Sequence, residues 1–328
     1  MKKTDASAAA TAIGMMAILL WSLMMGLVRL VSEAFGATLG PPLIYTCGAI
    51  LLLIFHRPAP LKQAPLKYLL VGGGLVVFYE SAISLSIGLA ASSAQSVEIS
   101  LVNYLWPTLM VLLAAAVSHR KHAVGYAIPG AIVATAGVII SVGGNSGLDW
   151  HAAAHNIASN PLPYALALAG AVAWAVYAVV TPSMANGYDG TSVFFPFVAL
   201  ALWIIHFVTD TGMTGGGSAS TGGGAGDAGI RGIGAVMGNL IGQLTAASWI
   251  DWLIVVLTAA SIAGGYACWG YGILHGSMET MAVASYATPL LSVAASAVLL
   301  HVSLSVPFWV GALLVVAGSI VNWLFQKR

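Results

Sequence analysis

The sequence predicts an all-α integral membrane protein with ten transmembrane helices arranged as two inverted five-helix repeats. Three observations predict this fold: an extremely apolar composition, ten apolar runs of bilayer length, and a duplicated set of short motifs. Hydrophobic residues make up 59% of the 328-residue chain and charged residues only 6%, with a mean hydropathy of +0.94. Because a soluble domain carries about 25% charged residues, this chain lacks the polar side chains to cover a water-exposed surface.

The ten apolar runs are close to the length of about 20 helical residues that a bilayer core requires. They lie near residues 9–33, 40–56, 67–90, 95–118, 122–143, 162–185, 191–209, 248–273, 280–301 and 305–325. The first run continues to about Val31, which is too long for the apolar region of a signal peptide, so we expect a retained first helix.

The cationic residues predict the orientation of these helices. Nine of the eleven fall on one side of a ten-helix arrangement: Lys2, Lys3, Arg57, Lys62, Lys67, Arg120, Lys121, Lys327 and Arg328. Cytoplasmic loops of membrane proteins carry an excess of Lys and Arg, so both termini are expected in the cytoplasm.

Two short motifs occur twice, about 180 residues apart. Tyr104-Leu-Trp-Pro107 precedes His119 by the same interval at which Tyr286-Ala-Thr-Pro289 precedes His301. A second match follows each histidine: Gly130-Ala131 with Ala136-Gly137, and Gly311-Ala312 with Ala317-Gly318. A unit of roughly half the chain has therefore been duplicated, which is typical of secondary transporters.

The duplication predicts the domain organisation. The first repeat spans residues 1–145, an external loop 146–161 follows, and the second repeat spans 162–328. Each repeat has five spans, an odd number, so the second copy must lie inverted, with a binding site near the pseudo-two-fold axis at the membrane midplane. The Gly-rich stretch at about 210–247 predicts a flexible external insertion.

Two carboxylates lie within or at the start of predicted spans, where ionisable groups are costly and usually functional. Glu80 lies near the middle of the third span, and Ser84 and Gly88 follow it on the same helix face. A substrate site and an interhelical hydrogen-bonded knot are both consistent with this stripe. Glu98 opens the fourth span, where it is either a site residue or a helix-terminus carboxylate stabilised by the dipole.

Helix breaks are predicted in the fourth and ninth spans. Pro107 leaves a backbone carbonyl without its partner and bends the helix, and Pro289 does so in the other half. Asn103 and Trp106 share a helix face with Pro107, whereas Ser285 and Tyr286 precede Pro289. These breaks predict a cavity lined by polar and aromatic groups.

Aromatic side chains at helical spacing complete the candidate cavity. The candidates, with the residues already named, are Trp21 and Met25, Tyr79, Trp174 and Tyr177, and Tyr266 and Trp269. Such stripes serve either helix packing or the binding of a flat apolar ligand, and depth in the membrane distinguishes the two.

The sequence argues against several other classes of protein. Cys47 and Cys268 lie inside apolar runs, which predicts buried free thiols and no metal site. No lysine occurs in mid-span to carry retinal, histidines lie at span ends or in loops, and no metalloprotease or P-loop motif occurs. We therefore expect no enzymatic activity, no cofactor, no nucleic-acid partner and no obligatory protein partner.

The stretch Glu98–Pro107, with Tyr79-Glu80 upstream, resembles bacterial aromatic amino-acid exporters of the drug/metabolite transporter superfamily, EamA type. The likeness continues through Ala171–Tyr177, Gly272–Gly276 and Ser285–Pro289 and covers nearly the whole chain. It implies two inverted five-helix repeats, an inner-membrane location, and export of aromatic amino acids through a central cavity. The Gly-rich insertion departs from the family pattern.

This combination predicts a secondary exporter of Phe, Tyr and Trp that works by alternating access. Aromatic side chains and Met25 would contact the substrate ring, Glu80 or Glu98 would pair with its ammonium group, and Asn103 and tyrosine hydroxyls would bind its carboxylate. The alternative is an exporter of lipophilic drug cations or other metabolites of the same superfamily, for which a deep carboxylate such as Glu80 is also suited.

Overall fold

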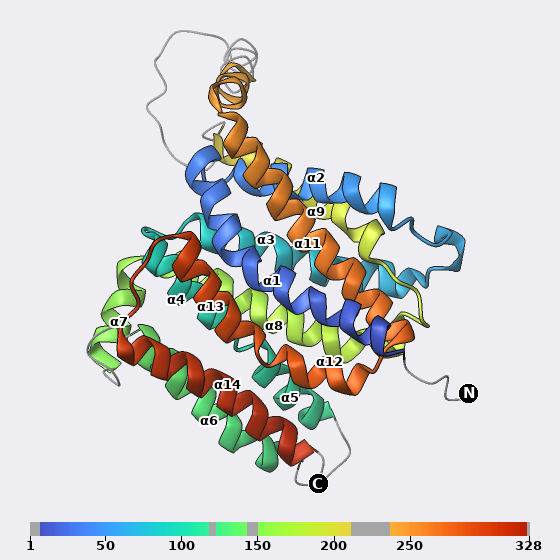
Figure 1. Cartoon of the computed structure of the whole chain (residues 1–328), viewed down its shortest axis with the longest axis vertical. Helices are drawn as coiled ribbons and strands as arrows, with labels where there is room; N and C mark the ends of the chain where they lie inside the picture. The colour runs from blue at the N-terminus through green and yellow to red at the C-terminus, as the bar shows by residue number, and fades with distance from the viewer. Residues whose placement is uncertain (1–6, 118–122, 143–149, 211–236, 327–328) are drawn as a thin grey trace, which may run out of the picture.

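The computed structural model describes residues 7–117, 123–142, 150–210 and 237–326. All regular elements within these ranges are helices, and most of them run in similar or opposite directions across the molecule (Figure 1). The all-α class predicted from the sequence is therefore confirmed. His119 and most of the Gly-rich insertion lie outside the described residues.

The helices follow the predicted apolar runs closely. In the first half they are α1 (Ala8–Phe35), α2 (Gly40–Phe55), the 3-10 turn η1 (Leu61–Gln63), the π-helix η2 (Tyr68–Gly72), α3 (Gly73–Gly88), α4 (Ser93–Asn103), α5 (Trp106–Val117) and α6 (Ala123–Val142). In the second half they are α7 (Trp150–Ser159), α8 (Pro161–Met184), α9 (Thr191–Asp210), α11 (Trp249–His275), α12 (Met278–Ser285), α13 (Thr288–Leu299) and α14 (Val306–Gln326).

Five helical segments within the described ranges are long and apolar enough to cross a membrane. They are Ala8–Phe35, Tyr68–Gly88, Pro161–Thr181, Thr191–Thr209 and Trp249–Gly272. Four shorter apolar helices of 10–17 residues accompany them: Gly40–Phe55, Ile128–Val142, Thr288–Leu299 and Val306–Val321. These helices are those of a membrane protein, as the composition predicted.

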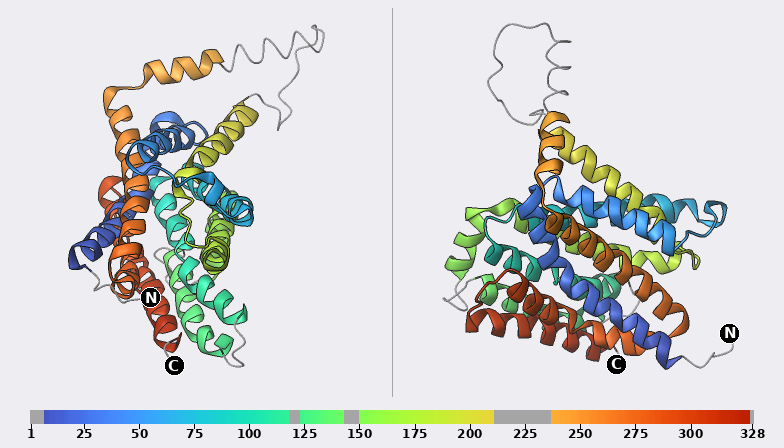
Figure 2. Two further views of the ribbon diagram at one scale, coloured as in Figure 1. Left: turned by 90° about the vertical axis from the view of Figure 1, so that its right-hand side faces the viewer. Right: turned by 45° about the horizontal axis from the view of Figure 1, so that its top comes forward.

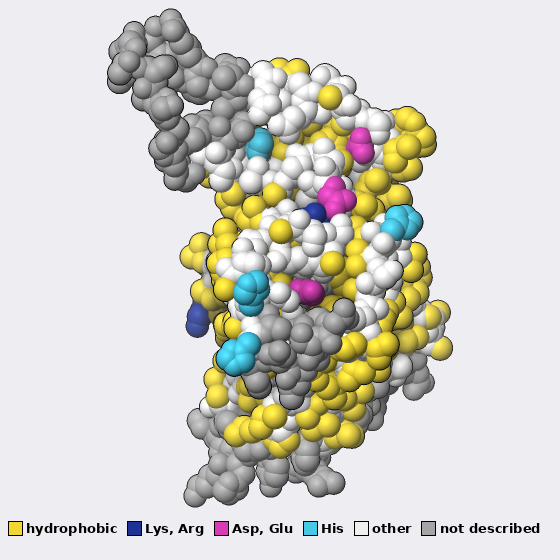
Figure 3. Space-filling model, turned by 90° about the vertical axis from the view of Figure 1, so that its left-hand side faces the viewer, with side chains coloured by type: hydrophobic (Ala, Val, Ile, Leu, Met, Phe, Trp, Pro, Cys, Tyr) yellow, Lys and Arg dark blue, Asp and Glu magenta, His cyan; other side chains and the backbone are white. Residues whose placement is uncertain are grey.

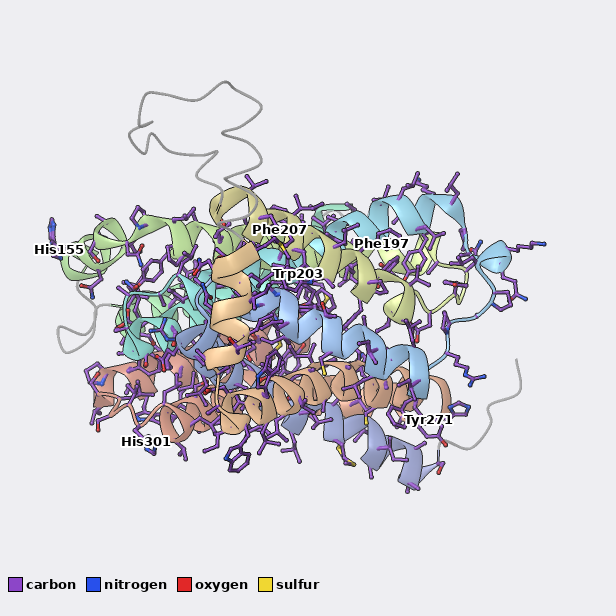
Figure 4. The ribbon with its side chains drawn as sticks, turned by 90° about the horizontal axis from the view of Figure 1, so that it is seen from above. His155, Phe197, Trp203, Phe207, Tyr271 and His301 are labelled. Atoms are coloured by element: carbon purple, nitrogen blue, oxygen red, sulfur yellow. The ribbon has the colours of Figure 1, made fainter. Side chains whose placement is uncertain are left out.

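Helix α1 lies at the centre of the molecule, where it packs along α11 and also contacts α13, α2 and α3 (Figure 1). Helices α6 and α14 lie side by side at one edge, and α2 pairs with α9 at the opposite edge (Figure 2). The start of α1 and the α2–α3 connection lie at the right of Figure 1, whereas α14 ends at the bottom of the picture, near its middle. His155 and His301 lie at one end of the bundle and Tyr271 at the other (Figure 4).

The helix breaks predicted at the two prolines are confirmed. α4 ends at Asn103 and α5 begins at Trp106, after a two-residue turn. Pro289 occupies the first turn of α13, which likewise follows a turn after α12. Proline is tolerated in a first turn because the backbone N–H there has no intrahelical partner anyway.

Two segments expected to be loops contain helices. Helix α7 lies inside the connection 146–161, where Asn156 donates a hydrogen bond to the carbonyl of Val142 (2.7 Å). Residues 237–246, within the stretch 210–247, are also helical. Leu240 and Leu244 are spaced one helical turn apart and pack on the apolar core. The Gly-rich composition of the preceding residues obscured this stripe.

Arg29 joins the end of α1 to the end of α3 and the start of α4. Its guanidinium pairs with Glu33, one helical turn further along α1, at 2.7 Å and donates to the carbonyl of Ala90 at 2.7 Å. Ser93, at the start of α4, donates to the same Glu33 carboxylate (2.7 Å). This end of the molecule faces the viewer in Figure 3, which shows acidic side chains and histidines but few Lys or Arg.

Candidate functional site

Glu80 on α3 is completely buried and accepts hydrogen bonds from two tyrosines. The Tyr45 hydroxyl, on α2, donates to one carboxylate oxygen at 2.5 Å. The Tyr266 hydroxyl, on α11, donates to the other oxygen. The carboxylate thus ties together three helices that are distant in the sequence.

The two tyrosine hydroxyls would stabilise an ionised Glu80 carboxylate. An ionised carboxylate only accepts hydrogen bonds, and both tyrosine hydroxyls can donate to it. Such charge-assisted bonds are about twice as strong as neutral ones. No Lys or Arg of the described residues forms an ion pair with Glu80. Because burying a charge without a counter-ion is costly, this carboxylate is suited to receive a cationic group.

A cluster of aromatic rings lies beside the hydrogen bond from Tyr266 to Glu80, where α1 packs against α11. The Trp21 ring centroid lies 5.3 Å from that of Tyr266 and 5.4 Å from that of Trp269. The Trp21 indole approaches the backbone of α11 at Gly265, where a Cβ atom would lie 2.5 Å from the indole Nε1. Glycine at this position therefore allows the indole to lie against the helix.

The cluster continues on the α8 side through Trp174. Its ring centroid is 4.8 Å from Tyr79, 5.2 Å from Tyr177 and 6.2 Å from Tyr266. Trp106, in the first turn of α5, meets Trp174 edge-to-face at 6.4 Å. Trp174 is thus the ring that joins the two halves of the cluster. The indole-bearing residues Trp21, Trp106, Trp174 and Trp269 are only partly buried.

Asn103 places an amide at the edge of this cluster, at the end of α4. The amide nitrogen donates to the Tyr79 hydroxyl at 3.5 Å, and the side chain is fully buried. Its Oδ1 atom has no hydrogen-bond partner within the described part of the chain. Because a buried polar atom without a partner costs about 1–3 kcal/mol, this amide is suited to a polar ligand group.

Eight of the predicted site residues are therefore brought together by hydrogen bonds and ring contacts: Trp21, Tyr79, Glu80, Trp106, Trp174, Tyr177, Tyr266 and Trp269. Asn103 joins them through Tyr79.

Four other predicted residues are not among those that these hydrogen bonds and ring contacts join. The Glu98 carboxylate accepts a hydrogen bond from Tyr164 at 2.9 Å, apart from the Glu80 cluster. Met25 is buried in α1, and no ring contact or hydrogen bond of the described residues joins it to the cluster. Ser285 ends α12, and Tyr286 lies in the turn before α13. Glu80, and not Glu98, is thus the carboxylate of the aromatic cluster.

Two residues of the cluster were not predicted. Tyr45 binds Glu80, and Phe195 on α9 contacts Tyr45 and Tyr266 with ring centroids 5.5 Å apart in both pairs. A single tyrosine in the middle of the apolar α2 is the signal that the sequence offered for Tyr45. Phe195 lies in an apolar run and carries no comparable signal.

A histidine–carboxylate contact joins the end of α2 to the start of α9. His56 Nε2 lies 3.0 Å from the Asp189 carboxylate, and the backbone N–H of Thr191 donates to Asp189 at 2.9 Å. Burial alone would raise the pKa of Asp189, but the hydrogen bonds from Thr191 and His56 outweigh it and lower the pKa. Among the described residues, no group of three His, Cys, Asp or Glu side chains could hold a metal ion.

The chain is similar to known proteins over nearly its whole length. It is 38% identical to the aromatic amino acid exporter YddG of Escherichia coli strain K12, over 97% of this chain and 98% of that protein. It is 37% identical to YddG of Salmonella typhimurium, with the same coverage. The chain belongs to the YddG family of aromatic amino acid exporters.

Two further comparisons add to this assignment. A YddG protein of Ancylobacter novellus is 26% identical over 97% of the chain. A crystal structure with 23% sequence identity matches with a TM-score of 0.59 over 98% of this chain and 99% of that one, which supports the fold. No protein-family model matches the chain. Membership of the family agrees with the resemblance found at Glu98–Pro107.

Proposed function

We propose that this chain exports aromatic amino acids across the inner membrane by alternating access, with the cluster around Glu80 as its substrate site. The single observation that carries the proposal is a buried carboxylate that has no cationic partner among the described residues and lies in a cluster of indole and phenol rings. An aromatic amino acid carries the complementary groups, an ammonium ion and a flat ring. The relatives named as aromatic amino acid exporters support the same substrate class.

The proposed topology has ten membrane spans, with both termini in the cytoplasm. It counts α4 with α5, and α12 with α13, as two broken spans, and η2 with α3 as one. The start of α1 and the basic α2–α3 connection lie at the same side of Figure 1, which supports this orientation.

The packing of α6 against α14 supports the proposed inverted repeats. A Cβ atom at Gly137 would lie 2.5 Å from the carbonyl oxygen of Gly311. A Cβ atom at Gly318 would lie 2.5 Å from the carbonyl oxygen of Gly130. Gly130 corresponds to Gly311 in the duplication, and Gly137 to Gly318. Reciprocal contact of this kind is the mark of a two-fold relation between two equivalent elements.

The other helix pairs follow the same two-fold relation. In the proposed repeats, α1 corresponds to α8, α2 to α9 and α3 to α11. α1 packs on α11 as α8 packs on α3, and α2 packs on α11 as α9 packs on α3. α13 packs on α1 as α5 packs on α8. Two such halves have nearly equivalent packings, one open to each side of the membrane, and exchange between them is the proposed transport step.

In the proposed site each substrate group has a partner of matching chemistry. The ammonium group pairs with Glu80, and the ring lies among Trp21, Trp174 and Tyr266 with the offset or edge-on geometries that aromatic pairs prefer. Asn103 Nδ2, which donates one N–H to Tyr79 and has a second, is the donor proposed for the substrate carboxylate. Glu98 has no role in this site.

The same observation keeps one alternative open. A lipophilic cation would also be attracted by Glu80 and by the faces of the indole rings. Such a cation lacks the carboxylate that Asn103 is proposed to bind. The two substrates therefore differ in how far they depend on Asn103.

Thermal stabilisation of the purified protein separates these alternatives. Trp and Phe should raise the melting temperature in a concentration-dependent manner, since a ligand that binds only the folded state stabilises it. Tetraphenylphosphonium, a lipophilic cation, should raise it less at equal concentration. Stabilisation by the cation alone would overturn the assignment to aromatic amino acids. An Asn103→Ala variant should reduce stabilisation by Trp and leave that by the cation unchanged.

A further inference from the structure

An apolar groove runs between η2–α3 and α9, on the side of α3 away from α1. Its lining is formed by Leu61, Leu66, Leu69, Leu70, Gly73, Gly74, Val77, Val193, Phe194, Phe197, Leu200, Ala201 and Ile204, around a volume of about 540 Å³. From Val193 to Ile204 the groove follows α9 for about 16 Å, given 1.5 Å per helical residue. Figure 4 labels Phe197, which is 57% exposed and lies on α9.

The groove is separate from the Glu80 cluster and has no polar side chain in its lining. Gly74 lies in its wall, and a Cβ atom there would meet no other atom within 4 Å. In contrast, a Cβ atom at the neighbouring Gly73 would lie 2.9 Å from the Phe194 ring. The space in front of Gly74 is therefore open and faces outward.

One end of the groove carries two unpaired positive charges. Leu61 and Leu66 line this end, and Lys62 and Lys67 directly follow them in the chain. Both lysines are exposed, and neither forms an ion pair with another of the described residues. The segment 56–72 contains no acidic residue, and Asp189, across from it, is already paired with a histidine.

From this arrangement we infer that the groove binds an anionic phospholipid, with an acyl chain between α3 and α9 and the phosphate at Lys62 and Lys67. The apolar wall supplies the site for the chain, and the two ammonium groups supply the complement to the headgroup. Clusters of Lys and Arg next to a membrane helix bind anionic lipids in this way. The inference does not depend on which solute the protein transports.

Lipid titration of the purified full-length protein in a neutral detergent tests the site. Phosphatidylglycerol and phosphatidylcholine with identical acyl chains are the probes, and native mass spectrometry counts the bound lipid. Phosphatidylglycerol should bind more tightly than phosphatidylcholine. A Lys62→Gln/Lys67→Gln variant should lose about fivefold in phosphatidylglycerol affinity for each lysine and bind phosphatidylcholine as before. A Lys2→Gln/Lys3→Gln variant, with the same loss of charge at a distant place in the sequence, should retain the wild-type preference.

A second variant tests the acyl-chain half of the site. Gly74→Leu places a side chain in the open groove and should weaken binding of both lipids. Gly242→Leu is the matched control, because a Cβ atom at Gly242 also meets nothing within 4 Å and that residue lies outside the groove.

Three results would overturn the inference. The first is equal binding of the two lipids by the wild-type protein. The second is an unchanged affinity of the double lysine variant for phosphatidylglycerol. The third is an unchanged affinity of Gly74→Leu for both lipids. Inorganic phosphate is the remaining probe: competition by phosphate at millimolar concentration would identify a free-anion site instead, whereas no competition supports the lipid.

Discussion

Glu80→Gln is the substitution that most sharply tests the role of the buried carboxylate. The glutamine has nearly the same shape but no charge, and its amide has only one oxygen to accept from Tyr45 or Tyr266. The side chain therefore loses one charge-assisted hydrogen bond, which costs about 1.5–3 kcal/mol of stability. It also loses the proposed ion pair with the substrate ammonium group.

The expected loss of substrate affinity follows from the burial of Glu80. Removing one partner of a buried, hydrogen-bonded charge pair costs about 2–5 kcal/mol. At 1.4 kcal/mol for each tenfold change in affinity, the Kd for Phe should rise by about 30- to 4000-fold. The assay is equilibrium binding of labelled Phe to purified protein, with the folded state verified by a monodisperse elution profile and a thermal melt.

A ligand without the amine provides the internal control. Phenylpropionate lacks the ammonium group, so Glu80→Gln should not weaken its binding. Glu98→Gln is the matched protein control, because Glu98 accepts a hydrogen bond from Tyr164 and not from a residue of the cluster. The Glu98→Gln protein should bind Phe with the affinity of the wild type. A folded Glu80→Gln protein that binds Phe within twofold of the wild type would refute the proposed pairing.

Three further predictions concern the rings, the loop ion pair and the repeat interface. Trp174→Leu should weaken Trp binding by about 2- to 10-fold, the value of one aromatic pair, while Trp252→Leu, at the outer start of α11, should leave it unchanged; equal effects in a binding assay would contradict the site. The pKa of Asp189 is lowered in the folded protein, so its stabilising contribution is complete above the unfolded value of about 3.9 and is lost as the pH falls through the lower folded value. Thermal melts between pH 3 and 7 should therefore show a smaller acid destabilisation in Asp189→Asn than in the wild type; identical profiles would be inconsistent with this linkage. Gly137→Ala should destabilise the protein by about 1–3 kcal/mol, since the methyl group overpacks against the α14 backbone; an unchanged melting temperature would argue against that close approach.

Much of the fold could be predicted because each element leaves a local signal. The apolar runs determine the helices, and Pro107 and Pro289 lie in the first turn after each of the two breaks. A proline alone does not fix a break, since Pro129 and Pro196 lie inside the continuous helices α6 and α9. Helix α7 and the helix at 237–246 were missed because they are short and lie beside Gly-rich or polar segments. In such segments the overall composition predicts a loop, because only two or three apolar residues indicate the helix.

The candidate site could be predicted in part. Glu80, Trp106 and Trp174 stand out because charged and indole side chains are conspicuous inside apolar helices. Their partners could not be found in the same way, since Tyr45 and Phe195 lie on α2 and α9 and meet the cluster only through tertiary packing. Glu98 was equally conspicuous and is bonded elsewhere, to Tyr164.

Flux of labelled Trp from proteoliposomes that contain the wild-type protein tests the central claim most directly. The account predicts saturable efflux that excess Phe or Tyr competes away and that tetraphenylphosphonium leaves largely intact, with little flux through Glu80→Gln. Efflux no faster than from protein-free liposomes, or inhibition by the lipophilic cation as strong as that by Phe, would contradict it.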